Sequence, residues 1–168
     1  MMSSAAGLLA AALACGAQAG SSAGILTATI TIKANCHLTA TSEVSFGTVD
    51  PTTPSNVSGA GSISVACTKG STISSIVLNQ GNNFGGSTRR MSDGAGDFVA
   101  YELYTDSSHT TLWGDSTSGI GAALASGFTA SSSAGSPQSF SVYGLVRSNA
   151  LDVPANTYND TVNVTVNF

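Results

Sequence analysis

TVNVTVNF, residues 161–168, decides the fold, because apolar and polar side chains alternate along its whole length. Such alternation predicts a strand with one buried face. Its apolar face would carry Val162, Val164, Val166 and Phe168. Residues 26–33 alternate in the same way, and their apolar face would carry Leu26, Ala28, Ile30 and Ile32.

Strands at both ends of a chain leave two interpretations open. The two strands pair with each other inside one ordinary sandwich, or the first strand of one copy completes the sheet of the next copy. The second interpretation follows from the edges, because an unpaired strand edge invites pairing with another chain.

Residues 1–19 have the pattern of a secretory signal. An apolar stretch runs from Ala5 to Ala14, and small residues at Ala17 and Ala19 mark a cleavage site, although no basic residue precedes the stretch. We expect the mature chain to begin near Gly20 and to be secreted. The apolar stretch is too short to cross a bilayer, and no other stretch is longer, so we expect no membrane span.

Two cysteines remain once the signal is removed, namely Cys36 and Cys67. In the oxidising compartments that a secreted protein enters, paired cysteines predict a disulfide. Metal binding is the competing use of two cysteines, but only His37 stands beside either of them, so we expect no metal site.

Composition limits the classes of partner. Charged residues make up 8% of the chain and the net charge is −4, with five basic residues in all. Nucleic-acid binding needs a concentration of positive charge that this chain lacks, so we expect no nucleic-acid partner. About 150 residues of mature chain suit a single domain.

Short segments rich in β-branched and aromatic residues alternate with Gly, Ser, Asn and Pro clusters, which predicts an antiparallel sandwich. The predicted strands are 25–38, 43–49, 61–67, 74–80, 97–105, 126–132, 138–147 and 157–168. Within them, inward positions fall to Ile63, Val65 and Cys67, to Val99, Tyr101 and Leu103, and to Phe140, Val142 and Val146.

The sequence contains few residues in patterns typical of a catalytic site. His37 and His109 lie in no nucleophile or metal motif, and no Gly-x-Ser-x-Gly elbow is present, so we expect no enzyme and no cofactor. Arg89 and Arg90 suggest a solvated strand edge or partners for nearby aspartates. Trp113 suggests either an anchor that packs a turn or a platform for a sugar ring.

A series of landmarks follows in a set order: Cys36, Phe46-Gly47, residues 61–65, Cys67-Thr68, Arg90-Met91, residues 101–104, Trp113 and residues 158–161. This order resembles the spore coat protein U domain family, which includes subunits of archaic (Csu-type) chaperone-usher pili. The resemblance extends from about residue 24 to residue 168.

The resemblance implies an incomplete immunoglobulin-like β-sandwich at 34–168 that is completed by a donor strand. The donor extension would be residues 20–33, with Leu26, Ala28, Ile30 and Ile32 filling a groove between the last strand and the strand around Cys36. The implied partners are a periplasmic pilus chaperone, an outer-membrane usher and neighbouring pilus subunits, and the implied destination is a cell-surface pilus. The alternative is a self-contained secreted coat or adhesive module that binds a carbohydrate or an apolar surface.

Overall fold

The computed structural model describes residues 16, 18–130 and 136–168, so most of the predicted signal lies outside the described residues. The chain divides into two units, residues 1–31 and Ile32–Phe168, which are described separately. No helix in the described part of the chain has the length and apolar character that a membrane span requires.

The first unit contains no strand among its described residues. The side chains of Leu26 and Ile30 are 94% and 85% exposed. The predicted strand at 25–38 is therefore wrong for residues 25–35, and the first strand begins at Cys36. A strand is stable only beside a neighbour, and alternation alone does not supply one.

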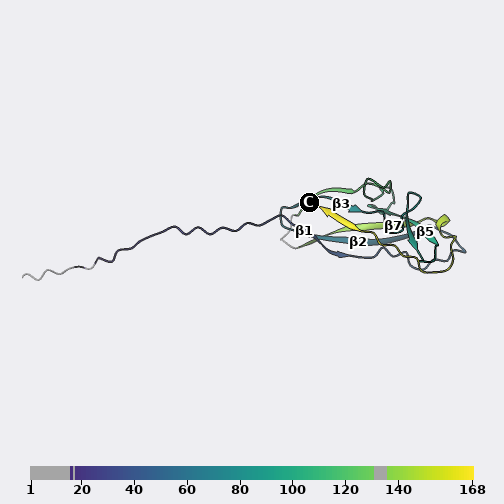
Figure 1. Cartoon of the computed structure of the whole chain (residues 1–168), viewed down its shortest axis with the longest axis horizontal. Helices are drawn as coiled ribbons and strands as arrows, with labels where there is room; N and C mark the ends of the chain where they lie inside the picture. The colour runs from purple at the N-terminus through teal and green to yellow at the C-terminus, as the bar shows by residue number, and fades with distance from the viewer. Residues whose placement is uncertain (1–15, 17, 131–135) are drawn as a thin grey trace, which may run out of the picture. The chain divides into compact units, whose positions relative to one another are not determined.

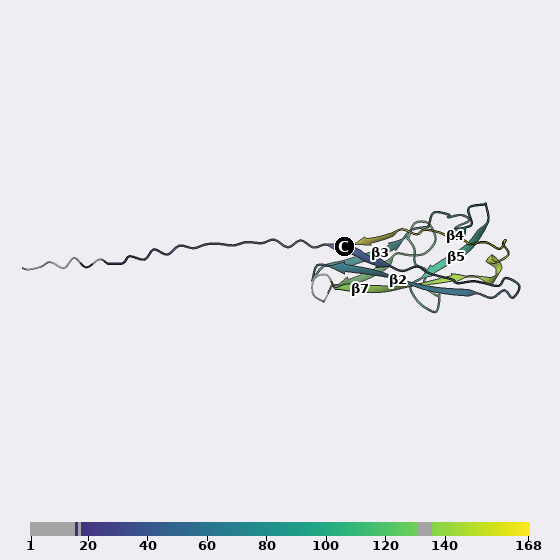
Figure 2. The ribbon, with the colours of Figure 1, turned by 90° about the horizontal axis from the view of Figure 1, so that it is seen from below.

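The second unit consists of two antiparallel sheets, drawn in Figures 1 and 2. The larger sheet has the order β1-β2-β7-β5-β4, and the smaller has the order β6-β3-β8. Its elements are β1 Cys36–Thr41, β2 Val57–Cys67, β3 Thr72–Leu78, β4 Arg89–Ser92, β5 Phe98–Tyr104, β6 Leu124–Thr129, β7 Pro137–Val146, the 3-10 turn η1 Ser148–Ala150, and β8 Val164–Asn167. The predicted all-β class is confirmed.

The core lies between the two sheets and follows the predicted alternation. Ile63 and Val65 of β2 are buried, and so are Val99, Tyr101 and Leu103 of β5 and Phe140, Val142 and Val146 of β7. From the smaller sheet, β3 contributes Ile73, Ile76 and Leu78. Most of these side chains are apolar, and removing them from water is the main favourable term in folding.

Residues 43–49 differ from the prediction, because they form no strand but only an isolated bridge between Ser45 and Ala60. This segment crosses the inner face of the larger sheet. A Cβ at Gly61 would lie 2.9 Å from the carbonyl oxygens of Ser42 and Glu43, and a Cβ at Gly144 would lie 2.6 Å from Val44. The bare glycine backbones therefore let the segment pass close over the inner face of β2 and β7, while Ser42 and Ser45 remain bonded to β2.

The second unit has two ends, which we call the head end and the tail end. The head end comprises residues 33–35, the turn between β2 and β3 at 68–71, and Phe168. The tail end comprises residues 48–56, the turn at 93–97 between β4 and β5, and residues 151–157. Strand β2 runs from the tail end to the head end, and β7 runs antiparallel to it.

Candidate functional site

The last strand, β8, has one unpaired edge. It pairs with β3 from Leu78 opposite Val164 to Ser75 opposite Asn167, and no strand of the described chain lies on its other side. The side chains of Val162, Val164 and Val166 pack partly buried against the core, whereas Phe168 is 55% exposed. The predicted alternation of 161–168 is present, although the ladder covers only 164–167.

A groove runs along this open edge. Its first cavity, of about 280 Å³, lies between the segment from Thr41 to Phe46 on one wall and the segment from Tyr158 to Val164 on the other. Buried core residues also line this cavity, including Ile63, Leu78, Tyr101, Leu103 and Val142. The core is thus open along this groove, which we call the acceptor groove.

The groove continues in both directions. Toward the tail end, a second cavity of about 490 Å³ is lined by Val49, Leu151 and Val153 together with Phe46 and Tyr158. Toward the head end lies Leu38, which is opposite the buried Val65 in the ladder and yet is 40% exposed. An inward-facing leucine with this much exposure indicates that no element covers that end of the groove.

Residues 43–46 form a groove wall that the sequence interpretation did not assign. It placed the second wall at the strand around Cys36, whereas Val44 and Phe46 contribute much of that wall in the structure. The sequence did indicate an apolar face in this segment, because the alternation of Val44 and Phe46 predicted a strand at 43–49. What the sequence could not show is that this segment crosses close over the inner face of the larger sheet at Gly61 and Gly144.

Asp160 holds the chain where it enters β8. Its Oδ1 accepts hydrogen bonds from the backbone N–H groups of Asn82 (2.9 Å) and Asn83 (3.2 Å), and its Oδ2 accepts one from Tyr101 Oη at 2.7 Å. Gly81, with φ +79°, passes so close to this carboxylate that a Cβ there would collide with it. This network fixes one wall of the groove to β5 of the larger sheet and to residues 81–83.

The predicted disulfide is confirmed, and it lies next to the head end. Cys36 and Cys67 lie directly opposite each other in the β1–β2 ladder, with Cα atoms 4.1 Å apart. The bridge encloses a separation of 31 residues. It ties β1, the outer strand at this edge of the larger sheet, to its neighbour.

Arg89 does not lie on a solvated edge, so that interpretation was wrong. Its side chain is buried, and its guanidinium donates to the carbonyl oxygens of Asn79 (2.9 Å), Leu78 (2.9 Å) and Trp113 (3.0 Å). Three carbonyls converge on the site because β3 ends there, and a guanidinium can satisfy them at once. Arg90 instead lies over the ring of Phe98, 4.1 Å from its centroid.

Trp113 is an anchor in the core and not an exposed platform. Its side chain is fully buried, and Nε1 donates a 2.9 Å hydrogen bond to the carbonyl oxygen of Ile76. A sugar ring stacks only on an aromatic face that solvent can reach. Trp113 therefore cannot serve as a sugar-binding surface in this fold.

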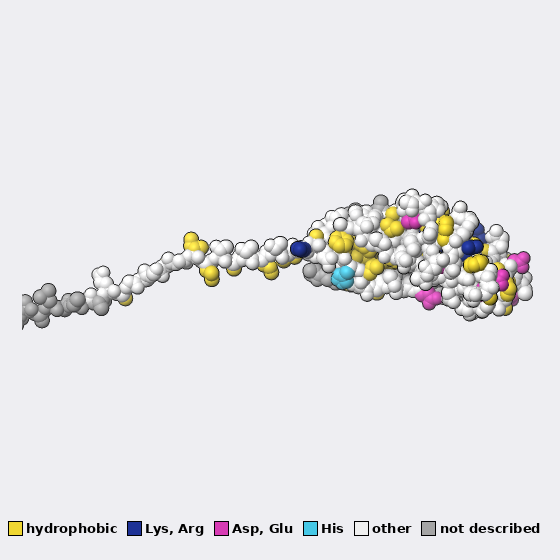
Figure 3. Space-filling view, in the orientation of Figure 1, with side chains coloured by type: hydrophobic (Ala, Val, Ile, Leu, Met, Phe, Trp, Pro, Cys, Tyr) yellow, Lys and Arg dark blue, Asp and Glu magenta, His cyan; other side chains and the backbone are white. Residues whose placement is uncertain are grey.

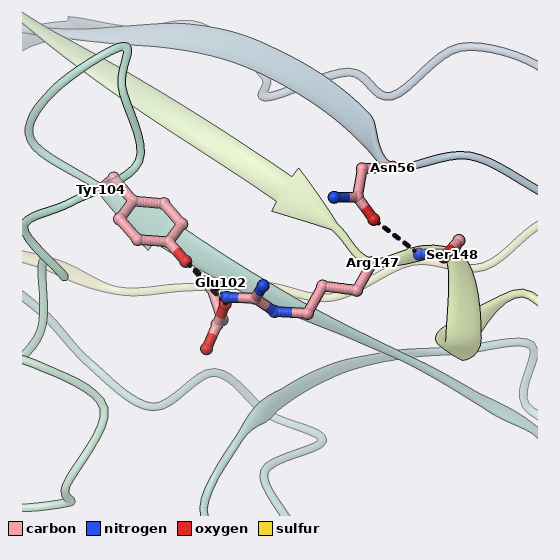
Figure 4. Close-up of polar contacts among 5 residues, drawn as sticks. All are labelled: Asn56, Glu102, Tyr104, Arg147 and Ser148. Carbon is pink, nitrogen blue, oxygen red and sulfur yellow. Dashed lines mark hydrogen bonds and ion pairs between the residues drawn. The ribbon is translucent and has the colours of Figure 1, made fainter.

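A polar cluster joins β5 to the end of β7 (Figure 4). Tyr104 Oη donates to Glu102 Oε2 at 2.6 Å, and Arg147 Nη2 donates to the same oxygen at 2.8 Å. Burial, followed by the hydrogen bond to Glu102, raises the pKa of Tyr104 to about 12. A phenol that stays protonated at neutral pH and faces a paired carboxylate is not an activated nucleophile, so the cluster acts as a structural brace.

The comparisons with known proteins agree with this fold. Residues 22–165 match the model of the Spore Coat Protein U domain. Protein U of Myxococcus xanthus is 38% identical over 137 residues, which covers 74% of this chain and 71% of that protein. A family of coat proteins and a disulfide within the fold both agree with secretion. The chain belongs to the Spore Coat Protein U domain family.

Proposed function

We propose that this protein is a structural subunit of a surface pilus and polymerises by donor-strand exchange. Residues 22–32 of one copy would lie in the acceptor groove of the next copy. The observation that carries the proposal is an open groove onto the core, in a chain that also carries an unpaired apolar segment of matching pattern. Before assembly, a periplasmic chaperone would cover the groove, and an outer-membrane usher would exchange it for the donor.

The two patterns match in length and in spacing. The donor face carries four apolar residues over residues 26–32, and the last strand carries four over residues 162–168. Burying three large aliphatic side chains and one alanine contributes roughly 5 to 9 kcal/mol of gross transfer free energy. The ordering of the segment opposes this gain, and the new backbone ladder adds to it.

The donor would occupy a defined place in the smaller sheet. Residues 43–46 and the segment that leads into β8 line opposite sides of the acceptor groove. A strand between them would extend the order β6-β3-β8 and would also give residues 43–49 a second neighbour besides β2. This accounts for a segment with strand-like alternation that forms no ladder in the single subunit.

The direction of the donor follows from the need for an open polymer. Ile32 and Cys36 are only four positions apart, a span of at most about 14 Å, so the donor's own body must lie near the end of the groove where Ile32 sits. With Ile32 at the acceptor's head end, two head ends would face each other and block a third copy. Ile32 therefore lies at the tail end, and the donor runs antiparallel to β8.

A pair of matched substitutions tests the proposal. Ile30→Asp places a charge on the donor face, and Thr29→Asp places the same charge on the opposite face of the same strand. We expect Ile30→Asp to abolish polymers of the mature chain in size-exclusion chromatography and electron microscopy, and Thr29→Asp to retain them. Polymers of normal length from Ile30→Asp would overturn the donor assignment and favour a self-contained coat module.

A further inference from the structure

The lysines of the second unit lie at one of its ends, and several of its acidic residues lie at the other. Lys33 and Lys69 are the only lysines of the chain, and both lie at the head end. Thr68 brings them together, because its hydroxyl donates to the carbonyl oxygen of Lys33 at 3.1 Å and its N–H donates to that of Asn35 at 2.8 Å. Both lysine side chains are exposed.

Acidic side chains gather at the opposite end. Glu43 lines the 490 Å³ cavity, and Asp50 and Asp152 each adjoin residues that line it. Asp93 is joined to the same rim, because Asn156 Nδ2 donates to its Oδ2 at 3.2 Å. Asp97 closes the same turn, and the basic residues nearby are Arg90, in β4, and Arg147, just after the end of β7. In Figure 3, acidic side chains (magenta) are visible at this end of the folded unit.

Asp50 and Asp93 accept hydrogen bonds from residues of their own turns, but none of the carboxylates named above forms an ion pair within the described part of the subunit. The one ion pair among the described residues joins Arg147, which follows the tail end of β7, to Glu102 of β5. The tail end thus combines a cavity open to solvent, lined in part by Glu43, with four aspartates and two nearby guanidinium groups, those of Arg90 and Arg147, whereas the head end carries two ammonium groups and no Asp or Glu side chain among its described residues. Opposite charges at opposite ends suit a contact that repeats from copy to copy.

We propose that consecutive copies join end to end through this charge pairing: the Lys33 and Lys69 end of the donor subunit docks on the acidic rim of the acceptor's tail cavity. The inference rests on the proposed donor-strand exchange, since Ile32 at the tail end places the adjoining Lys33 at that rim. The donor strand supplies the strength of the link, and the charged junction sets the angle between copies and excludes head-to-head contacts, where lysines would face lysines.

Zero-length cross-linking tests the junction directly. A carbodiimide joins an amine to a carboxylate only where the two touch, and the chain's lysines are confined to the head end, so each lysine cross-link reports on that end. Polymers would be assembled from a mixture of unlabelled and ¹⁵N-labelled mature chains, and mass spectrometry would identify links between copies. We expect links from Lys33 or Lys69 to Glu43, Asp50, Asp93, Asp97 or Asp152.

Variants that reverse the charge of a head-end lysine, alone or together with that of a tail-end aspartate, test the same contact. Lys69→Glu should slow polymerisation severalfold, Lys69→Arg should leave the rate unchanged, and Asp152→Lys combined with Lys69→Glu should restore part of it. Normal polymers whose lysines link to Glu102, Asp106 or Asp115, or to no carboxylate, would overturn the junction while leaving donor-strand exchange intact. A wild-type mature chain that stays monomeric would overturn both.

Discussion

Tyr101 of β5 and Asp160, in the segment that leads into β8, are joined by a 2.7 Å hydrogen bond from Tyr101 Oη to Asp160 Oδ2, which ties the larger sheet to one wall of the acceptor groove. Both residues line the groove. Burial, followed by the hydrogen bond to Asp160, raises the pKa of Tyr101 well above its ordinary value. The attachment of this groove wall to β5 therefore depends on a Tyr101 phenol that remains protonated.

Replacing Tyr101 with Phe should weaken this wall without opening a large cavity. A hydrogen bond to a charged group contributes about 1.5 to 3 kcal/mol, so we expect the free energy of unfolding of the mature chain to fall by that order. Urea unfolding followed by Trp113 fluorescence measures the change. An unfolding free energy equal to that of the wild type would contradict the role given to this bond.

The same pair predicts a dependence of stability on alkaline pH. Because the folded pKa of Tyr101 is raised, its contribution is fully present below the unfolded value near 10 and is lost as the pH rises above that value. The wild type should therefore lose stability above about pH 10, and Tyr101→Phe should lose less over the same range. Parallel losses in the two proteins would assign the alkaline effect to other groups.

Arg89 should be sensitive to conservative replacement. Lysine keeps the charge but cannot reach the three carbonyls that the guanidinium satisfies. We expect Arg89→Lys to cost roughly 3 kcal/mol or more in unfolding free energy, because buried carbonyls lose their donors. Arg90→Lys, on the adjacent and less buried side chain, is the control and should cost less than Arg89→Lys, because Arg90 makes one short hydrogen bond, from Nε to the carbonyl oxygen of Asn83 at 2.9 Å, besides its cation–π contact with Phe98.

The disulfide should contribute measurably to stability. For the 31-residue separation between Cys36 and Cys67, the chain-entropy model gives about 3 to 4 kcal/mol. The double substitution of both cysteines by serine should lower the unfolding free energy by about this amount, as measured by urea denaturation. A fall in unfolding free energy of less than about 1 kcal/mol would mean that the hydrogen bonds between β1 and β2 keep β1 in place without the disulfide.

Much of the fold could be predicted from the sequence, because several strands bury one face and expose the other. The alternation in β2, β5 and β7 placed their core residues correctly. Strand β4 was not among the predicted strands, and the burial of Arg89 within it depends on carbonyls contributed by distant segments. No local pattern reports such a long-range arrangement.

The groove could be predicted only in part. The alternation of residues 162–168 indicated one wall, but the second wall depends on the crossing of residues 43–46 over Gly61 and Gly144. The segment at 26–32 alternates as a strand and forms none in the single subunit. Periodicity describes what a strand would bury, and it does not say which chain supplies the neighbour.

The most direct test of donor-strand exchange moves the donor within one chain. Residues 1–32 would be removed and a copy of residues 22–32 appended after Phe168 through a short turn, which suits a strand antiparallel to β8. The measurement is the thermal unfolding midpoint of this chain against that of the mature chain. We predict a rise of roughly 10 °C or more. An unchanged or lower midpoint would show that the sandwich is already complete and would contradict the account.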